Sequence, residues 1–252
     1  MNYVEYGKEN KYDDNIFFQK YSQMSRSQQG LAGAGEWETL RKLLPDFKDK
    51  RVLDLGCGYG WHCIYAMEHG ASSVVGVDIS HKMLEVAKEK THFPQVEYKC
   101  CAIEDVEFPE ESFDVILSSL AFHYVADYEI LVKKIYRILK SGGKLVFTVE
   151  HPVFTAYGTQ DWYYNEKGEI LHFPVDNYYY EGKRTAVFLG EKVTKYHRTL
   201  TTYLNTLLSN GFIINHIVEP QPPEYMMDIP GMQDEMRRPM MLIVSANKKM
   251  DR

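Results

Sequence analysis

The sequence of 252 residues contains no run of Lys and Arg long enough to follow a phosphate backbone, and its formal net charge is −6. This composition argues against duplex nucleic acid as a partner. No apolar stretch approaches the length of a membrane span, and the first residues, MNYVEYGKENKYDD, lack the apolar core of a signal peptide. We therefore expect a cytoplasmic protein that makes no membrane contact.

Cysteine is scarce, and its spacing excludes two classes of site. The four cysteines, Cys57, Cys63, Cys100 and Cys101, contain no CxxC pair. Neither a zinc knuckle nor a redox motif is therefore indicated, and we expect no metal site. Tyrosine, in contrast, is abundant: 19 residues, gathered near the N-terminus and between Tyr157 and Tyr203.

Short apolar segments alternate with amphipathic ones along most of the chain. Seven segments have the pattern of strands: 51–55, 73–77, 96–100, 113–118, 144–150, 212–218 and 240–246. Helical patterns lie between them, over 59–69, after Ser80, over 130–139 and over 199–209, and a turn is expected at 141–143. The alternation predicts an α/β fold with a doubly wound, mostly parallel seven-stranded sheet. Its last two strands are expected to pair antiparallel.

The stretch VLDLGCGYG, residues 52–60, follows the pattern of a buried strand and a glycine turn. No GK[ST] follows it, and its third glycine comes too early for the dinucleotide fingerprint G-x-G-x-x-G. Asp78, at the end of the second strand, can accept hydrogen bonds from ribose hydroxyls. Asp54 is poorly placed beside a pyrophosphate but well placed near an ammonium group. A ligand with adenine, ribose and a zwitterionic amino-acid tail fits both, and S-adenosylmethionine (SAM) is such a ligand.

Four motifs, VLDLGCGYG, VVGVDIS, FPEESFDVILSSLAFHYVAD and RILKSGGKLVFTVE, resemble in order and spacing those of the class I SAM-dependent methyltransferases. The resemblance runs from Arg51 to Glu150 and implies a Rossmann-like methyltransferase fold with SAM as cofactor. The cofactor-binding residues that it implies are Gly56, Cys57, Gly58, Tyr59 and Gly60 around the amino-acid and ribose portions, Asp78 at the ribose, Ile79 and Met83 at the adenine, and Leu120 after the fourth strand.

One position departs from the family pattern. Many relatives carry an acidic residue after the third strand that accepts a hydrogen bond from the adenine amino group. Here Ala102 and Ile103 stand at this place. Their backbone could still flank the adenine, and Glu104 or Asp105 could reach its amino group.

The same resemblance implies that a leading helical segment covers the cofactor, with Tyr21 and Arg26 at its methionine end. Tyrosines of 157–180 would form the opposite wall, because aromatic faces attract a sulfonium. Alternatively, these tyrosines pack for stability or form a dimer contact. The expected layout is a single methyltransferase domain over 1–252, made of an N-terminal lid (1–35), a SAM-binding half (36–150), a tyrosine-rich covering insertion (151–198) and a C-terminal helix with strands (199–252). Within the insertion, 169–173 and 185–189 could pair as a hairpin.

Methyl transfer from a sulfonium requires alignment of the acceptor and exclusion of water, and a base only if the acceptor must lose a proton. His151, directly after the fifth strand, and His197 are the candidate catalytic residues. Candidate acceptor-binding residues are His123, Tyr157, Arg198 and Tyr203. The alternatives are a packing role for His123 and a capping role for Thr199 beside Arg198.

These observations predict a SAM-dependent methyltransferase that acts on an oxygen or nitrogen, or less favourably a carbon, of a small-molecule acceptor and releases S-adenosylhomocysteine (SAH). SSLAFHY replaces the Asn-Pro-Pro-Tyr type of tetrad after the fourth strand, which argues against adenine or glutamine amide methylation. Two alternatives remain: a non-catalytic SAM-binding regulatory module and a nicotinamide-dependent oxidoreductase. A homodimer through the insertion is compatible with all three.

Overall fold

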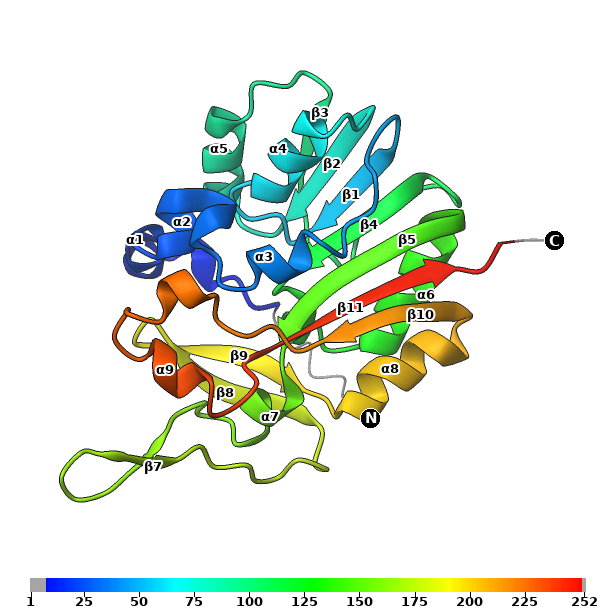
Figure 1. Cartoon of the computed structure of the whole chain (residues 1–252). Coiled ribbons are helices and arrows are strands. Elements are labelled where there is room, and N and C mark those ends of the chain that lie inside the picture. Colours follow the sequence, from blue (N-terminus) through cyan, green and yellow to red (C-terminus); the bar gives the residue numbers. More distant parts are fainter. Residues whose placement is uncertain (1–7, 251–252) are drawn as a thin grey trace, which may run out of the picture.

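A seven-stranded sheet forms the centre of the protein, in a computed structural model that describes residues 8–250 (Figure 1). The strand order is β10-β11-β5-β4-β1-β2-β3, and β11 runs in the direction opposite to the other six strands. The mostly parallel seven-stranded sheet and the antiparallel final pair are thus confirmed. The strands are β1 (Arg51–Leu55), β2 (Ser73–Asp78), β3 (Val96–Cys100), β4 (Phe113–Ser119), β5 (Leu139–Glu150), β10 (Phe212–Val218) and β11 (Met241–Lys248).

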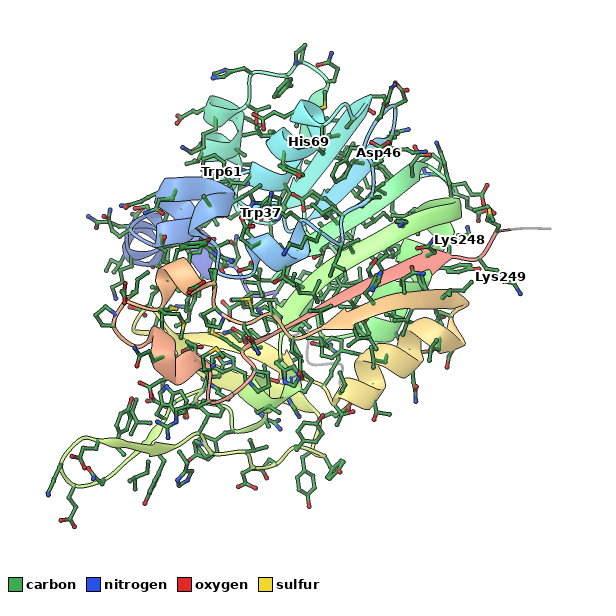
Figure 2. All side chains as sticks on the ribbon, viewed as in Figure 1. Trp37, Asp46, Trp61, His69, Lys248 and Lys249 are labelled. Carbon is green, nitrogen blue, oxygen red and sulfur yellow. The ribbon has the colours of Figure 1, made fainter. Side chains whose placement is uncertain are left out.

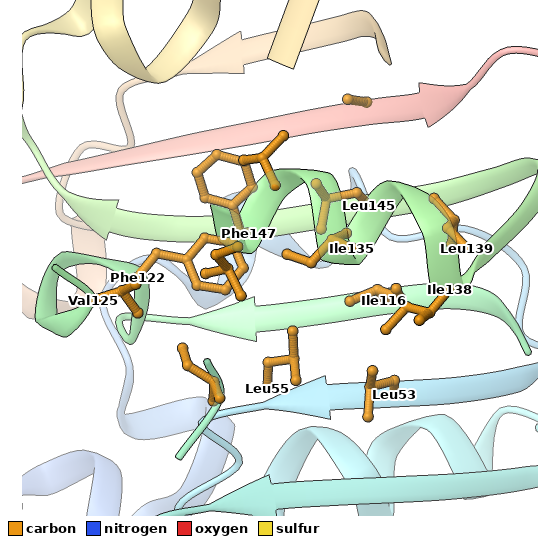
Figure 3. Packing of buried hydrophobic residues seen from close by; sticks show 14 of the residues in the cluster. Leu53, Leu55, Ile116, Phe122, Val125, Ile135, Ile138, Leu139, Leu145 and Phe147 are labelled. Carbon is orange, nitrogen blue, oxygen red and sulfur yellow. The ribbon is translucent and has the colours of Figure 1, made fainter. Parts of the chain in front are cut away.

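Alternating side chains of the strands divide the core into two layers. Leu53 and Leu55 of β1 point to the layer that contains α6 (Tyr128–Ile138) and α8 (Leu200–Ser209), and Figure 3 shows this packing. Val52, which directly precedes Leu53, points to the layer of α3 (Trp37–Leu40), α4 (Trp61–Glu68) and α5 (His81–Lys90). Both faces of the sheet are therefore covered, as a doubly wound fold requires.

Side-chain caps begin three of these helices. Ser80 accepts from the Met83 N–H, Asp127 from the Ile130 N–H, and Thr199 from the Thr202 N–H. One local expectation is wrong: the turn predicted at 141–143 lies within β5, which begins directly after α6 ends. The β4–β5 register shifts between Phe113 and Val115, so the glycines mark an irregularity in pairing.

The insertion contains two separate hairpins. β6 (Tyr163–Tyr164) pairs with β7 (Ile170–His172), and β8 (Gly182–Phe188) pairs with β9 (Glu191–His197). The expected pairing of 169–173 with 185–189 is therefore wrong, because each patch pairs with its own sequence neighbour. Leu189 and Gly190, at φ of 54° and 78°, provide a two-residue turn between β8 and β9. Figure 2 shows the side chains of the β6–β7 hairpin projecting from the body of the protein.

Short helices surround the carboxyl-terminal rim of the parallel strands (Figure 1). Ahead of the sheet are η1 (Lys11–Asp13), α1 (Asn15–Ser22), α2 (Ser25–Gln29) and η2 (Gly30–Gly33); after β4 and β5 come η3 (Phe122–Tyr124) and α7 (Pro152–Ala156); after β10 come η4 (Glu224–Met226) and α9 (Met232–Glu235). The first seven residues of the expected lid, 1–7, and residues 251–252 lie outside the described residues. Within 8–250, no helix combines the length and apolar character needed to cross a membrane.

Candidate cofactor and acceptor site

A cavity of about 520 Å³ lies along the rim where the parallel strands end. The chain segments after β1, β2, β3 and β4, the ends of β5 and β9, and the start of β11 all contribute to its lining. Cavities of this size at this edge of a doubly wound sheet are the usual ligand sites of such folds. The strand order places the residues that follow β1, β2 and β3 at one end, the cofactor end. Residues at the end of β5, after β10 and at the start of β11 lie at the other end, the acceptor end.

The glycine turn forms one wall of the cofactor end. The N–H groups of Gly56 and Cys57 both donate to the Val77 carbonyl, at 2.8 and 2.9 Å, and this fixes the turn to β2. Gly56 has φ of +77°, and a Cβ there would overlap the Cβ of Ala121. A Cβ on Gly58 would have no atom closer than Met83 Cε at 3.6 Å. Gly56 is therefore required by packing, whereas Gly58 leaves open space beside the turn.

Asp78 lies at the centre of the cofactor end. Its Oδ2 accepts from the Gly58 N–H at 2.8 Å and its Oδ1 from the Ser80 N–H at 2.9 Å. Burial raises the pKa of this carboxyl to about 6. Each carboxylate oxygen can accept a further hydrogen bond, so Asp78 can still accept two from vicinal hydroxyls. Ile79, Met83, Ala102 and Ile103 provide the apolar surface next to it.

Two buried carboxylate oxygens beside this end have no hydrogen-bond partner, Glu36 Oε2 and Asp54 Oδ1. The other oxygen of Glu36 accepts from Arg26 Nη2 at 2.5 Å, and Asp54 Oδ2 accepts from Cys63 Sγ at 3.5 Å. Burial raises the pKa of Asp54 to about 7. Of these two acids only Glu36 lines the cavity, and its free oxygen beside Arg26 suits a ligand that carries both an ammonium and a carboxylate group.

This pKa predicts how stability depends on pH. The carboxyl of Asp54 titrates near 4 in the unfolded chain and at about 7 in the folded protein. Between these values the folded state holds a proton that the unfolded state releases, so stability falls as the pH rises through this window. Asp54→Asn cannot ionise. We compare the change in melting temperature, variant minus wild type, of the ligand-free protein at two pH values. This change should be more positive at pH 8 than at pH 5 by about 3 °C or more.

The measurement is a pair of thermal melts at each pH, with Asp114→Asn as control. The pKa of Asp114 is lowered, because hydrogen bonds from the Arg51 N–H and Lys140 outweigh its burial. Asp114→Asn should therefore lose about the same stability at pH 5 and at pH 8, because both lie above the range in which this carboxyl titrates. An Asp54→Asn effect that is equal at pH 5 and pH 8 would show that Asp54 titrates normally.

The N-terminal segment closes the cavity by joining both of its ends. Asp13 Oδ1 accepts from Ser80 Oγ at 2.6 Å and from the Lys82 N–H at 3.1 Å, which attaches the segment to the start of α5. Glu9 accepts from the Thr194 N–H at 2.6 Å, which attaches it to the β8–β9 hairpin. Between these contacts, the Tyr12 hydroxyl lies 3.4 Å from that of Tyr124. The segment therefore bridges the cofactor end and the insertion.

A buried polar network lies at the acceptor end. Lys195 Nζ contacts Glu150 Oε1 at 2.5 Å and Gln160 Oε1 at 2.9 Å, and Gln160 Nε2 donates to Glu150 Oε2 at 2.6 Å. His123 Nδ1 accepts from the Glu150 N–H at 3.4 Å. Burial, opposed by Glu150, lowers the pKa of His123 to about 4, so its ring is neutral and carries its hydrogen on Nε2. Most of the rest of this end is apolar, with Gln221 and Glu235 as polar exceptions: Phe188, Pro220, Pro222, Met226, Ile229, Met232, Met240 and Met241.

The structure brings most of the predicted cofactor-binding residues to the cavity. Those that line it are Tyr21, Arg26, Gly56, Gly58, Asp78, Ile79, Met83, Ala102, Ile103 and Leu120, together with the acceptor candidate His123. The predicted residues Asp54, Cys57, Tyr59 and Gly60 are not part of this lining. Tyr59 packs edge-on against Tyr21, with ring centroids 5.9 Å apart, and Asp54 lies buried behind the turn.

Five other predicted residues lie outside the lining. His151 caps α7 by accepting the Val153 N–H, and its Nε2 is 2.9 Å from Glu219. His197 lies between Thr155 Oγ1 at 2.7 Å and the Tyr178 carbonyl at 2.8 Å. Arg198 donates to the backbone carbonyls of Phe122, Val125, Ala126 and Tyr196, Tyr203 is packed in the core, and Tyr157 is partly exposed to solvent.

Several lining residues escaped the sequence analysis. Glu150 ends the predicted fifth strand and could have been found by the rule that singled out His151. Glu36 and Lys195 carry no local motif, since their partners, Arg26 and Glu150, become neighbours only through the fold. The methionines of 226–241 are apolar residues in a segment read as a loop, and nothing in their spacing marks a cavity wall.

The strand order, the glycine turn and the cavity at the rim define a Rossmann-like fold of the methyltransferase type. Residues 53–147 match the family model described as a methyltransferase domain. A protein from Listeria monocytogenes assigned as a SAM-dependent methyltransferase is 58% identical with a TM-score of 0.84, over 87% of this chain and 99% of that one. A SAM-dependent methyltransferase from Mesorhizobium loti is 41% identical with a TM-score of 0.80, over 86% and 100%.

A further relative matches almost end to end. It is an uncharacterised protein of Haemophilus influenzae, 34% identical in an alignment of 250 positions that covers 94% of this chain and 96% of the relative. With these matches, the chain belongs to the class I SAM-dependent methyltransferases. SAM is therefore its cofactor, and the residues of the cofactor end fit it: hydroxyl acceptors at Asp78, and beside Arg26 the acid Glu36, one of whose oxygens has no partner.

Proposed function

We propose that this methyltransferase acts on an oxygen or nitrogen atom of a small molecule that is enclosed at the acceptor end. The observation that supports this is the continuity of the cavity, which extends from Asp78 past His123 to the apolar wall of Met240 and Met241. A molecule bound at the acceptor end would thus share one enclosed space with the cofactor. Family membership argues against the nicotinamide-dependent alternative.

The covering elements favour a small acceptor over a macromolecule. The N-terminal segment, the β8–β9 hairpin and the segment between β10 and β11 all contribute side chains to the lining, among them Tyr12, Lys195 and Met226. A folded protein surface or a duplex could not place a reactive atom beneath such a cover. All four cysteines are free thiols, which supports a reducing compartment, the cytoplasm, as the place of reaction.

The residues of this chain would act by binding, orientation and exclusion of water. SAM supplies the methyl group: a lone pair of the acceptor bonds to carbon, the carbon–sulfur pair leaves on sulfur as SAH, and an O–H or N–H proton passes to solvent. The neutral His123 has its Nδ1 turned to the Glu150 N–H and so offers Nε2–H as a donor. Both carboxylate oxygens of Glu150 are already engaged. Orientation of the reactants in a dry site can lower the activation barrier by several kcal/mol.

His123→Leu should lower kcat/KM by about tenfold to a hundredfold, because one oriented hydrogen bond to the acceptor is lost. SAM affinity should change by less than about threefold. The wild-type rate should show no acidic limb near pH 6.5, where a free histidine titrates, since the pKa of His123 is about 4. Steady-state kinetics from pH 5.5 to 9 and calorimetry with SAM measure both quantities. A limb near pH 6.5 that disappears in the variant would contradict this assignment.

Release of SAH from SAM in the presence of fractionated metabolites tests the proposed function. Product detection by mass spectrometry should identify one fraction that supports turnover and a product heavier by one methylene. The outcome against the proposal is equal binding of SAM and SAH with no turnover in any fraction. That result would indicate a non-catalytic SAM-binding module.

A further inference from the structure

The charges that line the cavity are the starting point. Within residues 8–250, three cations line it, and each contacts an acid. Lys8 is paired with Asp105, Arg26 with Glu36 at 2.5 Å, and Lys195 with Glu150 at 2.5 Å. The side chain of Lys195 is 3% exposed and that of Glu150 14%, so this last pair is largely withdrawn from water. No lining cation among the described residues is therefore left unpaired to receive an anion.

Acids outnumber cations along the same lining. Beside Glu36 and Glu150 it includes Glu9, Asp78, Glu104 and Glu235. Of the described residues that line the cavity, six are acidic and three are basic, with His123 neutral. The electrostatic potential inside a poorly solvated cavity with this balance is negative. It suits the positive charge of SAM and opposes a second ligand that carries a negative charge.

Two buried arginines near the acceptor end could have reversed this balance, but both are engaged elsewhere. Arg198 donates to backbone carbonyls beneath the cavity, including those of Phe122 and Ala126. Arg238 makes a two-pronged contact with Glu235 at 2.7 and 3.0 Å. Its guanidinium also lies over the rings of Phe154, Trp162 and Phe173. Neither arginine is part of the lining.

The apolar wall of the acceptor end also disfavours an anionic ligand. Met226, Met232, Met240 and Met241 line the acceptor end together with Ile229. Flexible thioether side chains adapt to apolar and aromatic surfaces. An anion placed against such a wall would lose its hydration without gaining a partner, which costs several kcal/mol.

We propose that the acceptor end selects an apolar acceptor, uncharged or cationic, and rejects acceptors that carry a carboxylate, phosphate or sulfonate. The proposal rests on the proposed function, because it takes this end of the cavity as the acceptor site. The Lys195–Glu150 pair is the specificity determinant: among the described residues that line this end, Glu150 neutralises the one cation that an anionic acceptor could use.

Two probes of similar size and different charge test the proposal: 2-naphthol, uncharged at pH 7, and 2-naphthalenesulfonate, an anion. Equilibrium dialysis against the protein saturated with SAH measures both affinities without turnover. We expect 2-naphthol to bind at least about tenfold more tightly than the sulfonate. Equal affinity, tighter binding of the sulfonate, or absence of 2-naphthol binding would each overturn the proposal.

A variant locates the effect. Glu150→Gln keeps the shape of the side chain and leaves Lys195 without its counter-charge, so the preference for 2-naphthol should fall by at least about fivefold. Glu107→Gln removes the same charge from an exposed side chain outside the lining and should leave the preference unchanged. An unchanged preference in Glu150→Gln would contradict the role of the pair. The dialysis experiment does not measure SAH release, so a negative result in it leaves the proposed function standing. Conversely, a protein that shows no turnover in the SAH-release assay can still be tested for this charge preference.

Discussion

Asp78→Ala is expected to weaken SAM binding by about a hundredfold while the protein stays folded. The carboxylate of Asp78 is held by the N–H groups of Gly58 and Ser80, and its remaining acceptor positions face the cavity. Two hydrogen bonds from ribose hydroxyls to a carboxylate are worth about 3 kcal/mol or more, which corresponds to that loss. Titration calorimetry measures the affinity, and circular dichroism the fold.

Asp114→Ala is the matched control for this prediction. Asp114 Oδ2 also accepts a backbone N–H, that of Arg51, but it lies at the opposite end of the strands. This variant removes the same kind of contact and should leave SAM affinity unchanged. Unaltered affinity in a folded Asp78→Ala protein would mean that the ribose is not bound at Asp78.

Gly56→Ala should be strongly destabilising. The new Cβ would overlap that of Ala121, and the backbone at φ of +77° disfavours any residue with a side chain. Overpacking and backbone strain together should cost about 2–4 kcal/mol, which lowers the melting temperature of a chain of this size by about 5–10 °C. Differential scanning calorimetry of the ligand-free protein measures the effect.

Gly58→Ala, two residues away, distinguishes the effect of the glycine turn on stability from its effect on SAM binding. Its φ of +52° also disfavours a side chain, but its methyl group would meet only Met83 Cε at 3.6 Å, so it should melt nearer to wild type than Gly56→Ala does. The same methyl group enters the open space beside Asp78 and should weaken SAM binding by about tenfold or more. Equal loss of stability in both variants would contradict the distinction drawn between the two glycines.

Most of the sheet and the cofactor end could be predicted because their signals are local. Apolar strands such as Val52–Leu55 and Val74–Val77 have clear sequence patterns, and in a parallel sheet their carboxyl ends must meet at one rim. Gly56, Gly58 and Asp78 follow directly from these strand ends. This is why these residues could be placed at the rim from the sequence, while their contacts with the cofactor stay a prediction.

The acceptor end could not be predicted in the same way because its contacts join distant segments. Tyr12 approaches Tyr124 across 112 positions of sequence, and Lys195 reaches Glu150 across 45. His151 was chosen because it directly follows the fifth strand, and His197 because it lies just ahead of the helical pattern at 199–209, yet their rings turn to Glu219 and to Thr155. Position along a strand predicts the rim on which a residue lies but not the direction of its side chain.

Titration calorimetry of the purified protein with SAM, SAH and NADH tests most directly the claim that the rim cavity is built for an adenosyl sulfonium. The account predicts that SAM and SAH each bind at one site per chain, that Asp78→Ala abolishes most of this binding, and that NADH gives no saturable heat. Stoichiometric binding of NADH together with no binding of SAM would contradict it.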